Sequence, residues 1–81
     1  MPDVNELLDI SIKETENLIE GEVFLIKDLF KGYEWNRLGH GTRLLLGTLF
    51  LNYVHKTGGS IVPVEKTSSG QQRYKRIVIK N

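Results

Sequence analysis

The sequence predicts a small α+β domain, and three observations support this fold class. Two long segments have helical periodicity, a short apolar segment lies between them, and two strand-like segments around a polar loop follow. At 81 residues, the chain is long enough for a single domain with one hydrophobic core, over residues 1–81. The expected element order is helix, strand, short helix, helix, strand, strand. This is the order of a winged helix-turn-helix domain, and we expect that arrangement. A small α+β fold of another topology is the alternative.

The first helix is expected over residues 3–20. Asp3 and Glu6 have the spacing of a capping box, in which a side chain accepts a hydrogen bond from the backbone at the helix start. Apolar residues then recur at intervals of three and four up to Ile19, as in a helix that buries one face. Gly21 is expected to end this helix, because glycine readily adopts the left-handed backbone found at that position.

Residues 22–41 are expected to contain a short strand, a helical turn and a connector. Residues 22–26 are β-branched and aromatic, which is typical of a strand, whereas residues 27–30 can form only one or two helical turns. Residues 31–41 include three glycines and are predicted to form a turn-rich connector. Its large apolar side chains are expected to pack against the core, namely Tyr33, Trp35 and Leu38.

The third helix is expected from Thr42 to Lys56, before two glycines. Its apolar residues extend almost all round it, so it is expected to be buried on more than one side or to contact a partner. Leu44 and Leu51 lie beyond the main apolar face. Because exposed apolar patches usually mark interfaces, we expect the chain to self-associate through them. That main face consists of Leu45, Leu46, Leu49, Phe50, Tyr53 and Val54. Gly47 interrupts the helix at a cost of about 1 kcal/mol relative to alanine, and close packing is the expected reason.

Two C-terminal strands are expected at residues 60–66 and 72–80, with the polar loop 67–71 as the tip of a hairpin. Pro63 lacks the backbone N–H that a central strand donates, so it is expected at a sheet edge or a bulge. The chain shows no internal repeat and no low-complexity segment.

Charge is distributed unevenly along the chain, although the net charge is only +1. Residues 1–34 contain nine acidic and three basic residues, whereas residues 35–81 contain one acidic and eight basic residues. This asymmetry predicts an acidic face and a basic face, and a basic face suits a polyanion such as nucleic acid. The alternative is that the acidic residues simply form the solvated side of the first helix.

The residue types that catalysis needs are scarce. The chain has no cysteine, and His40 and His55 are fifteen positions apart without a neighbouring run of carboxylates, so neither a reactive thiolate nor a metal site is expected. No serine or threonine lies in a nucleophile elbow or a P-loop sequence. We therefore expect no enzymatic activity, no cofactor, no metal and no small-molecule substrate.

The strongest functional signal is the segment Gln71–Arg76. Alternate residues of a strand share a face, so Arg73 and Lys75 are expected on one side of the hairpin, and Tyr74 and Arg76 on the other. Basic side chains can follow a phosphate backbone, and Tyr74 is expected to stack on an unpaired base. The alternative is a charged edge strand, in which lysines prevent aggregation.

Three further basic residues are expected to contact phosphates, namely Arg37, Arg43 and Lys56. Arg43 follows Gly39–Thr42 at the start of the third helix, where backbone N–H groups attract anions. The alternative is that this segment is a turn with an ordinary threonine cap. The third helix offers few side chains that could read duplex DNA, Arg43 and Asn52 at most. Binding that depends on the phosphate backbone, or that uses the hairpin, is therefore favoured.

The segment Phe24–Leu38 and its continuation resemble a small winged-helix family of unassigned function from Firmicutes and their mobile elements. The resemblance covers residues 22–76 and is carried by Gly-Tyr-Glu-Trp-Asn-Arg at 32–37, then by Arg43–Leu44, Leu46–Gly47, Phe50, Lys66–Ser69 and Gln71–Tyr74. One branch of that family, in staphylococcal cassette chromosome elements, is a winged-helix protein that binds single-stranded DNA beside a replicative helicase. The resemblance implies the fold and binding to single-stranded DNA, and it assigns no contact residues.

We therefore expect a non-catalytic protein that binds single-stranded DNA without sequence preference, in the replication of a mobile element. The alternatives are a duplex-binding transcriptional regulator that uses the third helix, and a protein-interaction module. No apolar run approaches the roughly 20 residues that span a bilayer, and the acidic start lacks the order of a secretory signal. Because no cysteine is present to form a disulfide, a cytoplasmic location away from the membrane is expected.

Overall fold

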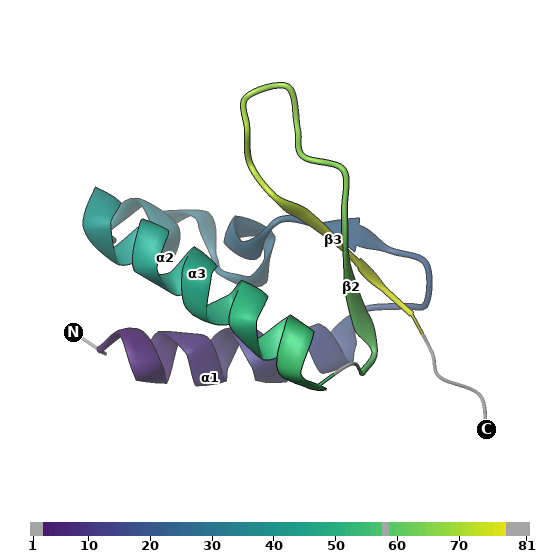
Figure 1. The fold of residues 1–81 in the computed structure, drawn as a ribbon. Coiled ribbons are helices and arrows are strands. Elements are labelled where there is room, and N and C mark those ends of the chain that lie inside the picture. Colours follow the sequence, from purple (N-terminus) through teal and green to yellow (C-terminus); the bar gives the residue numbers. More distant parts are fainter. Residues whose placement is uncertain (1–2, 58, 78–81) are drawn as a thin grey trace.

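The chain folds into a helical layer and a small sheet (Figure 1). The computed structural model describes residues 3–57 and 59–77. Its helices are α1 (Val4–Glu14), α2 (Gly32–Asn36) and α3 (His40–Thr57), its strands are β1 (Val23–Phe24), β2 (Ile61–Val64) and β3 (Arg73–Arg76), and 3-10 turns lie at Thr15–Asn17 and Ile26–Leu29. The expected α+β class is confirmed, and the arrangement is compatible with a winged helix.

The three strands form one antiparallel sheet in the order β1-β3-β2. β3 is the central strand, because Phe24 of β1 and Pro63 of β2 both pair with Tyr74, from opposite sides. Pro63 lies on an edge strand, as its missing N–H requires. The alternative of a charged edge strand for Arg73–Arg76 is therefore wrong, since this strand has a neighbour on each side.

α1 and α3 pack against each other, and the sheet lies beside the C-terminal half of α3 (Figure 1). The loop between β2 and β3, residues 65–72, extends away from the helices and is called the wing below. One side of α3 thus faces α1, while another side faces the wing.

Three aromatic rings, from β1, α3 and β3, form the centre of the core. Tyr74 stacks on Phe24 with ring centroids 5.8 Å apart, and it meets Phe50 edge-on at 4.9 Å. Phe24 and Phe50 are edge-to-face at 6.4 Å. Val54 and Ile61 belong to the same buried cluster, which therefore joins the helices to the sheet.

α1 begins as expected but ends earlier. The carboxylate of Asp3 accepts a hydrogen bond from the backbone N–H of Glu6 at 2.9 Å and so caps the helix. The helix ends at Glu14 and tightens into a 3-10 turn, where Thr15 is buried and its hydroxyl donates to a backbone carbonyl one turn earlier. Gly21, expected to end the helix, lies instead in the following turn that leads into β1, with a φ of 92°.

The segment expected to be a connector contains α2. The carboxylate of Glu34 accepts a hydrogen bond from the backbone N–H of Lys31 at 3.1 Å at the start of this helix. Trp35 packs against Phe30 with ring centroids 5.9 Å apart, as expected of a side chain that fixes the segment. Tyr33 is 54% exposed, so its expected place in the core is wrong. Residues two apart on a helix point to different sides, and here Trp35 takes the inner side.

α3 buries a narrower face than its sequence predicts. Its buried apolar residues are Leu46, Phe50 and Val54, which lie one turn apart along the helix. Leu45, expected in the core, is 48% exposed, and Leu44 is 61% exposed. Apolar surface thus remains uncovered along the first half of the helix.

The buried phenol of Tyr74 makes stability depend on pH in the alkaline range. Burial raises the pKa of Tyr74 from 10.0 to about 12. Because the folded pKa is the higher one, the protonated phenol contributes fully to stability below pH 10.0, and this contribution is lost as pH rises toward about 12. Tyr74→Phe keeps the ring but cannot titrate, so its free energy of unfolding should fall less steeply over this range. Urea denaturation of both proteins measures the difference, and identical pH dependence would contradict the burial.

Candidate functional site

The strand residues expected to form a binding surface do not share one face. Arg73 and Lys75 lie on the face of the sheet opposite to Tyr74, as strand alternation requires. Tyr74 is 1% exposed within the aromatic cluster, so the expectation that it stacks on a base is wrong. Arg76 lies on the same face as Tyr74, and its guanidinium donates to the hydroxyl of Ser60 at 2.8 Å. Of the four, Lys75 extends into solvent.

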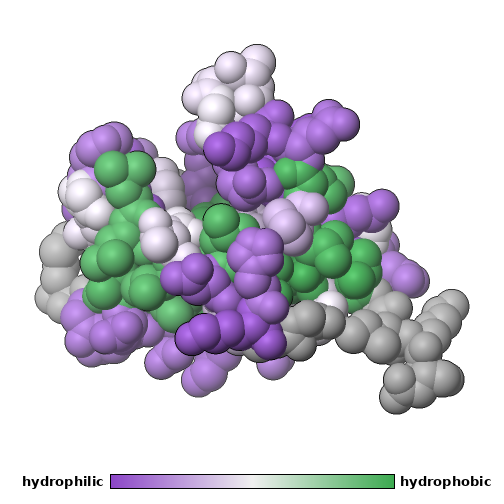
Figure 2. All heavy atoms as spheres, in the orientation of Figure 1, coloured by the Kyte–Doolittle hydropathy of each residue, from purple (hydrophilic) through white to green (hydrophobic). Residues whose placement is uncertain are grey.

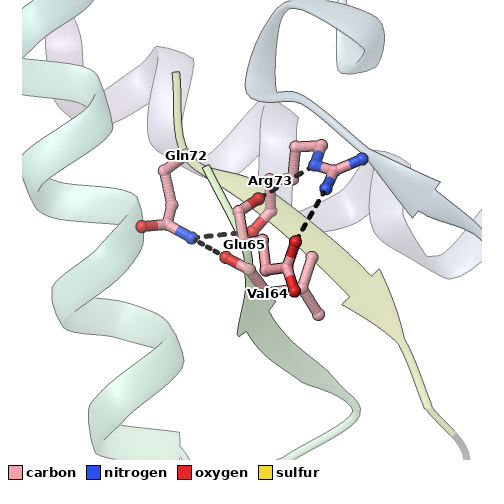
Figure 3. A network of polar contacts seen from close by, with 4 residues as sticks. All are labelled: Val64, Glu65, Gln72 and Arg73. Atoms are coloured by element: carbon pink, nitrogen blue, oxygen red, sulfur yellow. Dashed lines mark hydrogen bonds and ion pairs between the residues drawn. The ribbon is translucent and has the colours of Figure 1, made fainter. Parts of the chain in front are cut away.

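Arg73 is held at the base of the wing (Figure 3). Its Nε donates to the backbone carbonyl of Glu65 at 2.9 Å, and its Nη2 lies 4.0 Å from the carboxylate of the same residue. The side-chain amide of Gln72 donates to the carbonyls of Val64 and Arg73. An exposed ion pair adds little stability, but these hydrogen bonds join β2 to β3 where the wing begins.

The other expected phosphate contacts lie elsewhere. The Nη2 of Arg43 donates to the backbone carbonyl of Trp35 at 3.1 Å, and its guanidinium lies 5.4 Å from the centroid of the indole. Arg37 lies over the ring of Tyr33 at 5.0 Å. Lys56 is exposed near the C-terminal end of α3. The seven expected residues therefore do not converge on one site.

A groove of about 640 Å³ lies between α3 and the wing. α3 supplies one side, between His40 and Leu51, and the wing supplies the other. Lysine and arginine side chains surround the groove, namely Lys27, Arg43 and Lys66. None of the described residues that line it is acidic. These three cations come from three separate elements, and only Arg43 was expected as a phosphate contact.

The walls of this groove combine apolar and polar groups. Trp35, Leu44 and Leu51 provide apolar surface, whereas Thr48 and Gln71 provide hydrogen-bonding groups. Figure 2 shows hydrophobic side chains over the first half of α3 and more hydrophilic ones around the wing. A ligand with flat apolar parts and regularly placed negative charges matches this combination.

A second hollow of about 550 Å³ continues the groove towards α2. The two hollows share four lining residues, Lys27, Trp35, Arg43 and Gln71, so they form one depression, called the trough below. Gly32 lies at the α2 end of it. Arg43 stands where the two hollows join and contributes its charge to both.

The tip of the wing has a well-defined backbone. The N–H of Thr67 donates to the carbonyl of Gln71 at 2.8 Å, and the N–H of Gly70 donates to the carbonyl of Thr67 at 2.9 Å. Gly70 has a φ of 87°, the left-handed conformation that closes a three-residue hairpin loop. The wing therefore holds Ser69 and Gln71 toward the groove by its own hydrogen bonds.

Several residues of the trough were not expected as site residues, among them Lys27, Lys66 and Gly47. Lys27 and Lys66 are far apart in the sequence, and they line the same groove because the wing that carries Lys66 forms one of its sides. Gly47 also lines the groove, and a Cβ added there would meet its nearest neighbour, Ile26 Cδ1, at 4.0 Å. That is an ordinary contact, so the close packing expected at Gly47 is absent. A lone glycine inside a helix is the signal that could have pointed to this open surface.

Within residues 3–57 and 59–77, no group of three or more His, Cys, Asp or Glu could hold a metal ion. None of the helices in this described part of the chain is both long and apolar enough to cross a membrane.

Residues 10–76 match the family model described as Domain of unknown function (DUF1413), and the chain belongs to this family. The matched segment runs from within α1 to the end of β3 and contains every residue that lines the trough. No curated protein and no solved structure compared with the chain matches it.

Proposed function

We propose that this DUF1413 chain binds single-stranded nucleic acid, above all single-stranded DNA, in the trough between α3 and the wing, without catalysis. The observation that carries the proposal is the position of Lys27, Arg43 and Lys66 around the partly apolar groove between α3 and the wing, whose described lining contains no acidic residue; Asp28 lines the adjoining hollow towards α2. The cations suit phosphates, and the apolar side chains suit the faces of unpaired bases.

Local charge, more than net charge, determines attraction to this surface. α3 contains no Asp or Glu, whereas α1 carries exposed acidic residues along its length, among them Glu6, Asp9 and Glu14. The described part of the molecule measures 39 × 28 × 21 Å, and the screening length at physiological salt is about 8 Å. Acidic side chains farther than this length from the trough are therefore largely screened from a polyanion bound in it, whereas Asp28, which lines the hollow towards α2, is not.

A single strand fits the trough better than a duplex. Reading a duplex requires side chains that reach into the major groove with paired donors and acceptors. The exposed first half of α3 instead presents Leu44, Leu45 and Thr48, and its one arginine there, Arg43, donates to the backbone of Trp35. Apolar side chains match bases that are unpaired and accessible, so sequence-independent binding to a single strand is favoured.

The resemblance of residues 22–76 to the Firmicutes family also supports this ligand. The branch in staphylococcal cassette chromosome elements binds single-stranded DNA, and we propose the same ligand class here. A role in the replication of a mobile element, in the cytoplasm, belongs to the same proposal.

A protein-interaction module is the second candidate, because Leu44 and Leu45 expose apolar surface at 61% and 48%. Such exposure marks an interface when it forms a continuous patch. If this surface joins two copies of the chain, sedimentation equilibrium should show a dimer that Leu44→Ser and Leu45→Ser weaken. A monomer at all concentrations up to the millimolar range would contradict self-association.

Binding to a single strand should weaken steeply as salt increases. Each phosphate contact contributes about −0.7 to the slope of the logarithm of the association constant against the logarithm of salt concentration, so three cations predict about −2. Fluorescence anisotropy with labelled single-stranded and duplex oligonucleotides of equal length measures both affinities. Preference for the duplex would favour a transcriptional regulator, and no binding at low salt would remove nucleic acid as the ligand.

Substitutions at Gly47 test whether the trough is the binding surface. Gly47→Glu adds a negative charge to the groove, whereas Gly47→Gln adds a side chain of almost the same size without charge. Both residues are better helix formers than glycine, by about 0.5–1 kcal/mol, so both variants should be at least as stable as the wild type. Gly47→Glu should bind the oligonucleotide several-fold more weakly than Gly47→Gln. Equal affinities in the two variants would place the binding surface elsewhere.

A further inference from the structure

An exposed aromatic side chain lies next to the trough. Tyr33, on α2, is 54% exposed, and it is the only aromatic residue among the exposed large hydrophobic side chains in the described part of the chain. Its neighbours Gly32 and Trp35 both line the trough. Tyr33 is therefore close to the path of a nucleic-acid strand that leaves the trough over α2.

Two cations lie beside the ring of Tyr33. The guanidinium carbon of Arg37 is 5.0 Å from the ring centroid, and the Nζ of Lys31 is 6.0 Å from it. Both side chains are exposed, and neither forms an ion pair with another described residue. A nucleotide presents a flat base next to a charged phosphate, and an aromatic ring flanked by cations matches both parts.

The backbone that carries Tyr33 is held in place before any ligand binds. Glu34 accepts a hydrogen bond from the N–H of Lys31 at 3.1 Å, and Arg43 of α3 donates to the carbonyl of Trp35 at 3.1 Å. A preorganised group loses little freedom on binding. An exposed cation–π contact is weaker than a base stacked on an aromatic ring, so a base can displace a cation from the face of Tyr33.

We propose that Tyr33 is a stacking platform for an unpaired base, and that Arg37 and Lys31 contact the adjacent phosphates. This inference rests on the proposed function and extends the binding site from the trough onto α2. Tyr33 thus takes the stacking role that the sequence suggested for Tyr74, whose ring is buried.

Titration of the full chain with a labelled single-stranded oligodeoxynucleotide tests this role. Tyr33→Ala should weaken binding about 5- to 150-fold, the range for the loss of one stacked base. The salt slope should not change in this variant, because no charge is removed. Tyr33→Phe keeps the ring and should bind like the wild type, whereas Arg37→Ala should make the slope shallower by about 0.7.

A second ligand separates stacking from a structural role of Tyr33. An abasic phosphodiester chain of the same length offers charges but no bases, so the wild type and Tyr33→Ala should bind it equally. A Tyr33→Ala variant that loses affinity for both ligands, or a Tyr33→Phe variant as weak as Tyr33→Ala, would overturn the inference. If Tyr33→Ala binds the oligonucleotide like the wild type, the stacking role of Tyr33 is wrong, whereas the proposed function stands. A wild type that binds neither ligand overturns both.

Discussion

The packing of Tyr74 against Phe24 and Phe50 holds the rest of the structure in place. These rings come from β3, β1 and α3, and no two of their centroids are more than 6.4 Å apart. A chain of this length buries only about 60% of the surface that it exposes when unfolded, so a few large side chains provide much of its hydrophobic stabilisation. The same contacts fix the sheet beside α3, and they thereby determine where the wing leaves the sheet.

The trough follows from that placement. β3 is the central strand, and its side chains alternate between the core and the opposite face of the sheet. Its first residue, Arg73, is held by a hydrogen bond to the backbone at the base of the wing. The cations that face the trough come from other elements: Lys27 follows β1, Arg43 is on α3 and Lys66 is in the wing. A basic surface thus arises from the tertiary structure, although the net charge of the chain is only +1.

Local features of this fold could be predicted from the sequence, whereas the order of its strands could not. The cap at Asp3, the edge position of Pro63 and the polar hairpin tip each depend on residues close together in the chain. Whether a strand lies at the centre or the edge of a sheet depends on distant segments, so a tyrosine among basic residues looked accessible. α2 has only five residues, too few to show helical periodicity, and the exposure of Tyr33 was missed for that reason.

Backbone amide chemical shifts of the isotope-labelled protein, followed during titration with a short single-stranded oligonucleotide, test most directly whether the trough is the binding surface. We expect the largest changes at Gly47 on α3 and at Gly70 and Gln71 in the wing, all of which line the trough. The amides of α1 should hardly change, since α1 contributes no residue to the described lining. Large changes along α1, or at Lys75 on the opposite face of the sheet, with Gly47 and Gly70 unaffected, would contradict a single-strand site between α3 and the wing.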